Sequence, residues 1–172
     1  MMKKILFLIL ISGLFTGLSA SAQQDKSKRA SPPAKVSETI ASGATIIIDY
    51  SQPSLKGRSI GKDIVNYGEV WRTGANEATV FETNKDVQIE GKKLPAGKYS
   101  LYTIPGAKKW TVIFNKTWEQ WGTDYKQDTD ALRVDVIPTK APKTTEKMMF
   151  NIAKEGKVSL LWGNTAINFR VK

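Results

Sequence analysis

The sequence predicts an all-β fold: a single antiparallel β-sandwich or flattened barrel of roughly nine or ten short strands with little helix. Three observations support this fold class. Apolar residues recur at every second position in many short segments, and Gly, Pro and Asn residues separate those segments. No long segment shows the spacing of an amphipathic helix, and no internal repeat suggests a propeller or a solenoid.

The first 22 residues have the pattern of an export signal. Lys3 and Lys4 precede the apolar residues 5–18, and the small residues 20–22 form a cleavage site. The apolar run is shorter than a helix that spans a bilayer, so an uncleaved anchor is the less favoured alternative. We therefore expect export to the periplasm or the exterior, with no integral membrane segment after cleavage. Residues 23–34 are polar and contain two prolines, which favours a flexible leader before a domain at 35–172.

The first half of the domain contains four clear strand patterns. Residues 44–50 are rich in β-branched side chains, and residues 87–89 lead into a glycine turn. Residues 99–104 follow a Pro-Ala-Gly turn, and alternating apolar residues at 110–115 form the next strand. Residues 117–120 fit a capping box, which predicts one isolated helical turn.

The last third predicts a β-meander. Residues 132–136 alternate strictly between apolar and charged, and residues 148–152 form another strand that ends in a glycine turn at 154–157. Residues 158–162 and 167–171 each have an apolar face. Because Gly163 and Asn164 both tolerate positive φ, the sequence predicts a two-residue hairpin between these last two segments.

Composition removes several classes of chemistry. The chain has no cysteine and no histidine, so it has no disulfide, no thiol nucleophile, and neither the commonest general base nor the commonest metal ligand. We expect no cofactor and no metal. The formal charge is +10, or +8 without the two signal lysines. The lysines of the remaining chain are scattered over many turns and do not gather on one face. This distribution argues against nucleic-acid binding and favours a role in solubility and in charging the sheet edges.

Residues 49–79 break the regular alternation and are the best candidate for a binding site, since sites on β scaffolds lie on loops at strand ends. Two arginines suit a carboxylate, phosphate or sulfate group, two rings offer flat walls, and an amide and a carboxylate supply directional hydrogen bonds. The candidate ligand-binding residues are Tyr50, Arg58, Trp71, Arg72, Asn76 and Glu77.

Other roles for the same segment stay open. Arginine could pair with Glu77 or Asp49 while Trp71 fills the core, which would hold a long loop in place. Alternatively, the protein could be an envelope carbohydrate hydrolase that uses Glu77 and a second carboxylate. The domain could also be a structural or assembly protein that contacts an envelope protein partner through its sheet edges. No catalytic residue is assigned, and binding without catalysis is the preferred hypothesis.

Four strings in the sequence resemble a family of exported bacterial proteins, domain of unknown function 2911: DYSQPSLKGR, YGEVWRTGANEAT, GKKLPAGKYSLYTIPG and EQWG. The similarity runs from about residue 34 to the C-terminus. It implies residence in the envelope of a Gram-negative bacterium and implies no reaction. One departure is Gln52, which stands where the family pattern usually has arginine and so weakens any scheme with a third cation beside Arg58 and Arg72.

Overall fold

A computed structural model describes residues 25–172, so the expected export signal lies outside the described residues. Twelve strands and two short 3-10 helices form the described chain. The helices are η1 (Lys26–Lys28) and η2 (Gln127–Thr129). The strands are β1 (Pro33–Thr39), β2 (Thr45–Ser51), β3 (Ile60–Gly61), β4 (Val65–Asn66), β5 (Thr79–Thr83), β6 (Val87–Ile89), β7 (Lys92–Leu94), β8 (Gly97–Ile104), β9 (Trp110–Asn115), β10 (Asp130–Val136), β11 (Thr139–Ile152) and β12 (Lys157–Arg170).

The first layer is a six-stranded antiparallel sheet with the order β1-β2-β5-β8-β9-β10. Ile46 and Ile48 of β2 are fully buried, and β-branched residues of this kind pack well on a pleated, half-buried surface. In β10, Val134 and Val136 are buried whereas Asp135 between them is exposed. The predicted alternation of buried and wet positions is therefore confirmed in this sheet.

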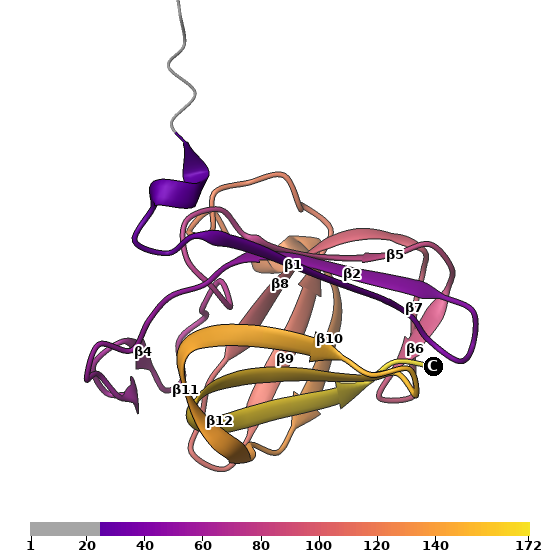
Figure 1. Ribbon diagram of the computed structural model, residues 1–172. Helices are drawn as coiled ribbons and strands as arrows, with labels where there is room; N and C mark the ends of the chain where they lie inside the picture. Colours follow the sequence, from indigo (N-terminus) through magenta and orange to yellow (C-terminus); the bar gives the residue numbers. More distant parts are fainter. Residues whose placement is uncertain (1–24) are drawn as a thin grey trace, which may run out of the picture.

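The second layer is built on the long β11–β12 hairpin, which in Figure 1 lies in front of β8 and β9. Both edges of the hairpin carry further short pairings. Ser54 pairs with Lys147 of β11, and Val171, just after β12, pairs with Ile89 of β6. β6 in turn pairs with β7 across the predicted glycine turn. The two layers form the predicted β-sandwich.

Aromatic rings fill the space between the two layers. Phe81 and Phe114 of the six-stranded sheet meet edge to face at 5.0 Å between ring centroids, and Phe169 of β12 lies 5.8 Å from Phe114. Trp110 and Trp162, from opposite layers, are each 2% exposed. Rings of this size contribute much of the apolar surface buried by folding, so these contacts hold the layers together.

The predicted hairpin at Gly163 and Asn164 is wrong, because β12 runs straight through both residues. The apolar residues have even numbers before this point and odd numbers after it, and this change of parity suggested a turn. A β-bulge has the same effect, because its extra residue moves the following side chains to the opposite face of the strand. The register between β11 and β12 shifts on either side of Thr145, which pairs with Gly163 at φ +58°. The real hairpin is the predicted turn at 154–157.

The predicted helical turn at 117–120 is also wrong. Of the two side chains that suggested a capping box, Gln120 donates instead to the Tyr102 hydroxyl of β8 at 2.9 Å. The backbone N–H of Thr117 donates to the side chain of Asn115 at the end of β9. One tertiary bond and one local bond to Asn115 thus take the place of the capping bonds.

At the N-terminal end, β1 begins at Pro33, two residues before the expected domain start, so the expected leader overlaps the first strand. The segment before it contains η1 and contacts the body of the domain, because the backbone N–H of Gln52 donates to the carbonyl of Pro32 at 2.9 Å. In residues 25–172, no helix is long and apolar enough to cross a bilayer.

Candidate functional site

Tyr50 lies near the end of β2, the other five predicted site residues lie between β2 and β5, and the structure distributes the six over separate places. The chain leaves β2, pairs briefly with β11, forms the small parallel β3–β4 ladder and returns along β8, where Trp71 and Thr103 exchange two backbone hydrogen bonds. Of the two arginines, Arg58 and Arg72 line different hollows that share no residue. The six residues therefore do not form one site.

The two predicted ring walls belong to the core. Tyr50 is 7% exposed, its ring meets Phe150 edge to face, and its hydroxyl accepts a hydrogen bond from the backbone N–H of Phe150 at 3.1 Å. Trp71 stacks on Trp162 at 5.4 Å and meets Trp110 edge to face at 6.3 Å. For Trp71, the structural alternative raised from the sequence is the better description, and Tyr50 proves to be a core residue as well.

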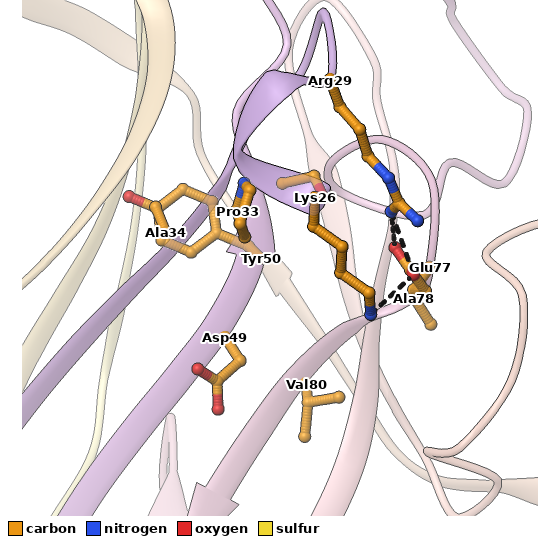
Figure 2. A pocket seen from close by; sticks show the side chains of 10 residues that line it. Lys26, Arg29, Pro33, Ala34, Asp49, Tyr50, Glu77, Ala78 and Val80 are labelled. Carbon is orange, nitrogen blue, oxygen red and sulfur yellow. Dashed lines mark hydrogen bonds and ion pairs between the residues drawn. The ribbon is translucent and has the colours of Figure 1, made fainter. Parts of the chain in front are cut away.

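Asn76 and Glu77 hold the N-terminal segment, as Figure 2 shows for Glu77. Arg29 donates to both carboxylate oxygens of Glu77 at 3.0 and 2.8 Å, and Lys26 Nζ lies 3.0 Å from Oε1. The Asn76 side chain donates to the carbonyl of Ser31 at 3.1 Å. These contacts fasten the segment before β1 beside β2 and β5, so both side chains already have protein partners.

The ion pairs of Glu77 also determine its protonation. Partial burial by itself raises the pKa of Glu77, but hydrogen bonds from its own backbone N–H, from Arg29 and from Lys26 outweigh burial and lower the pKa to about 2. A carboxylate that stays ionised at neutral pH does not supply the proton that a glycosidase's general acid must donate. Glu77 lines a recess between the N-terminal segment and strands β2 and β5, which Figure 2 shows. Asp49, the other carboxylate that lines this recess, pairs with Lys35 at 3.3 Å. Glu77 therefore does not suit the general-acid role in the hydrolase hypothesis.

Arg72 is the predicted residue that best keeps its binding capacity. It lines a solvent-open hollow of about 300 Å³, together with Val70, Trp71, Tyr102, Gly122, Thr123 and Tyr125. Three arginines of the described chain are partly buried: Arg29, Arg72 and Arg133. Arg29 and Arg133 pair with carboxylates, whereas Arg72 has no carboxylate within 4.0 Å among residues 25–172.

Gly122 leaves room for the side chain of Arg72. A Cβ atom at position 122 would lie 2.2 Å from Arg72 Cδ and 2.8 Å from the backbone oxygen of Asn76. The backbone N–H of Gly122 donates to that same oxygen at 3.1 Å, and Trp121 pairs with Glu77. Thus WRTGANEAT and EQWG, two of the strings that carry the family resemblance, pack directly against each other around Arg72.

The backbone that carries Arg72 is strained. Thr73 has φ +50° although its side chain is β-branched, and it is fully buried. Such residues rarely adopt positive φ, at a cost of order 1–3 kcal/mol, and they cluster at functional sites. Hydrogen bonds fix the conformation: the Thr79 hydroxyl donates to the Thr73 carbonyl at 2.9 Å, and the Thr73 hydroxyl donates to Thr103 at 3.2 Å. These hydrogen bonds keep the backbone beside Arg72 in the strained conformation.

The tyrosines of this hollow were missed by the sequence analysis. Burial raises the pKa of the Tyr102 phenol, and hydrogen bonds with Gln120 and Ser100 oppose part of that rise, with a smaller contribution from Arg72; the phenol keeps its proton at neutral pH. Tyr125 lies 4.8 Å from Tyr102 between ring centroids. A signal existed: within 99–104, Tyr102 has the opposite parity from Tyr99 and Leu101, which places it on the outer face of the sheet.

Arg58 lies elsewhere and is exposed. Its Nε and Nη2 atoms donate to the carbonyls of Leu55 and Ser54, each at 3.0 Å. Arg58 therefore stabilises its own loop. In the sequence it precedes the β3–β4 ladder, whereas Arg72 follows it. Among the described residues, no group of three or more Asp, Glu, His or Cys side chains is placed to hold a metal ion.

Fold and site together define a class of protein: a β-sandwich domain with an open, arginine-lined hollow. More specifically, the chain belongs to the family described as protein of unknown function (DUF2911), whose model matches residues 31–171. This match confirms the resemblance seen in the sequence. A comparison with curated proteins found no match. A comparison with solved structures also found none.

Proposed function

We propose that the domain binds, without catalysis, a small ligand that presents a carboxylate or another anionic group to Arg72. The observation that carries this proposal is a partly buried arginine that has no carboxylate partner in residues 25–172 and lines a hollow beside a strained loop residue. Keeping a cation partly desolvated costs free energy unless a counter-ion offsets it. An anionic ligand supplies that counter-ion.

The other lining groups define the ligand further. Tyr102 is 1% exposed and its hydroxyl accepts from Gln120, so it lines the hollow as a buried aromatic wall. Val70 is 40% exposed and contributes an apolar wall. The hollow is at the small end of the range for small-molecule sites. A compact ligand with one anionic group and an apolar body fits these features best.

Export remains part of the proposal. The pattern of residues 1–22 favours a signal peptide, so the ligand would be met in the envelope or outside the cell. N-terminal sequencing of the protein recovered from its native host tests this point: a first residue of Gln23 supports export with cleavage, and an intact Met1 contradicts it.

A thermal-shift screen of the mature domain against envelope metabolites, with small carboxylates as the first set, tests the binding proposal. A ligand at about 100 times its dissociation constant adds about 2.7 kcal/mol to the free energy of unfolding, a shift that is easily measured. Arg72→Gln should weaken binding by roughly 10- to 100-fold, because a charge-assisted hydrogen bond contributes about 1.5–3 kcal/mol.

Two further variants separate geometry from charge. Arg72→Lys keeps the charge but loses the planar fork, so it should bind with intermediate affinity. Arg170→Gln is the matched control, since Arg170 is exposed and forms no ion pair in the described chain. Equal loss of binding in Arg170→Gln and Arg72→Gln would show that net charge attracts the ligand, and would contradict a site at Arg72.

A further inference from the structure

A second hollow, of about 240 Å³, lies between the loop after β2 and the bulged part of the β11–β12 hairpin. Its lining combines an apolar base with a rim of uncharged polar groups and one arginine, and it includes no carboxylate. The lining residues are Leu55, Arg58, Ser59, Ile60, Thr144, Trp162, Gly163, Asn164 and Thr165. It shares no residue with the Arg72 hollow.

Hydrogen bonds within its own loop orient Arg58 at this hollow. The hydrogen bonds from Nε and Nη2 to the carbonyls of Leu55 and Ser54 fix the plane of the guanidinium. Nη1 makes no hydrogen bond to residues 25–172, and no carboxylate of that range lies within 4.0 Å. An arginine whose orientation is already fixed loses less conformational entropy when it binds a ligand.

The polar rim consists of groups with donors to spare. The Thr144 hydroxyl donates to Oδ1 of Asn164, which orients the amide and leaves its Nδ2 without a partner in the described chain. The hydroxyls of Ser59 and Thr165 likewise make no hydrogen bond to residues 25–172. Guanidinium, amide and hydroxyl groups together offer a set of donors suited to an acceptor-rich ligand.

The base of the hollow depends on the bulge. Gly163 has φ +58° and no side chain, and a Cβ atom there would lie 3.0 Å from Leu55 Cδ1. Trp162 beside it is buried, and its indole N–H donates to the Glu146 carbonyl at 3.2 Å. The bulge therefore keeps a shallow, rigid base beneath the donors.

We propose that this hollow is a second binding site, which takes an oxyanion of the phosphate or sulfate type, free or carried by a hydroxylated molecule such as a sugar. Arg58 pairs with the anion, and Asn164, Ser59 and Thr165 donate to its oxygens or to neighbouring hydroxyls. The absence of any carboxylate among the lining residues favours an anion over a cation or an amine.

Titration of the ¹⁵N-labelled mature protein with inorganic phosphate, at constant ionic strength, tests this proposal. The amide signals of Gly163 and Asn164 should move saturably, and chloride at the same ionic strength should leave them in place. Arg58→Gln should weaken phosphate binding at least 10-fold. Shifts spread over the lysine-bearing surface, or unchanged binding in Arg58→Gln, would overturn the proposal.

Because Arg58 also braces its loop, a second variant is needed that leaves those contacts intact. Asn164→Asp keeps the shape of the side chain and the oxygen that accepts from Thr144, but it adds a negative charge and removes the amide donor. It should abolish phosphate binding, and retained affinity in this variant would contradict the assignment.

Arg72→Gln separates the two sites: it should leave the phosphate shifts unchanged even if the proposed ligand of the Arg72 hollow is never found. Loss of the phosphate shifts in Arg72→Gln would contradict an independent second site. Comparison with a sugar phosphate identifies the source of the anion, since tighter binding than inorganic phosphate indicates that the rim also contacts the sugar, and equal affinity indicates a site for the free ion.

Discussion

Gly122→Ala is the most direct test of how the two recognised strings build the Arg72 hollow. The new Cβ would lie 2.2 Å from Arg72 Cδ, where carbon atoms normally stay about 3.5–4.0 Å apart. The arginine side chain is able to move away. The backbone oxygen of Asn76, 2.8 Å from the same Cβ, is less free to move because it accepts the hydrogen bond from the N–H of Gly122.

The expected loss of stability follows from these two contacts. Overpacking of this kind costs about 1–3 kcal/mol, and weakening the hydrogen bond from Gly122 to Asn76 adds about 0.5–1.5 kcal/mol. We expect the free energy of unfolding to fall by about 2–4 kcal/mol. Urea denaturation followed by tryptophan fluorescence measures it, and an unchanged m-value would show that the variant unfolds in the same two-state manner.

A double-mutant cycle isolates the contribution of the arginine. In an Arg72→Ala background the contact with Cδ is gone, while the contacts with the Asn76 oxygen and with Cβ of residue 72, at 2.8 and 2.9 Å, remain, so Gly122→Ala should cost about 1 kcal/mol less than in the wild type. A penalty within about 0.5 kcal/mol of zero in the wild-type background would refute the packing described here. An identical penalty in both backgrounds would refute the role given to Arg72.

Three further predictions concern other parts of the fold. Glu77→Gln removes the ion pairs with Lys26 and Arg29; because 39% of the Glu77 side chain is exposed, screening limits the loss to about 1–1.5 kcal/mol at neutral pH. Since the folded pKa is depressed, the wild-type advantage is full above pH 4.5 and disappears as the pH falls through about 2, and a pH-independent difference in unfolding free energy would contradict it. Thr73→Gly should be more stable than Thr73→Ala by about 0.5–1 kcal/mol, the reverse of the usual order, because only alanine is strained at positive φ; equal melting temperatures would argue against strain. Gly156→Ala should destabilise by more than about 3 kcal/mol, since its Cβ would collide with the backbone oxygen of Val171 at positive φ; a stable, soluble variant would show that this turn is adjusted easily.

The candidate site could be predicted only in part. The segment 49–79 was correctly singled out as irregular, and Arg72 within it lines a hollow together with Trp71, whose ring also packs on the core, but the other four candidates lie elsewhere. Tyr50 and Trp71 are core residues, Glu77 and Asn76 hold the N-terminal segment, and Arg58 lines a separate hollow. The segment has no periodicity that would reveal which side chains meet. Pairs such as Arg29 with Glu77, 48 residues apart, form only when the strands are placed side by side.

The C-terminal strands show a second kind of limit. The apolar faces of 158–162 and 167–171 were correctly identified, but their change of parity is satisfied equally by a turn and by a bulge. The choice depends on the partner strand: β11 is long enough to pair with both segments, so β12 continues through Gly163.

The sequence by itself determined the fold class, the inner face of most strands and the family, because alternation in a pleated strand is a local property that each segment displays on its own. The tertiary structure alone decided which charged groups are paired and which remain available. Ion pairs and hollows depend on contacts between residues far apart in the chain, and those contacts follow from strand order and register. Glu77, 48 residues away in the chain, lies 2.8 Å from Arg29, whereas no carboxylate of the described chain lies within 4.0 Å of Arg72.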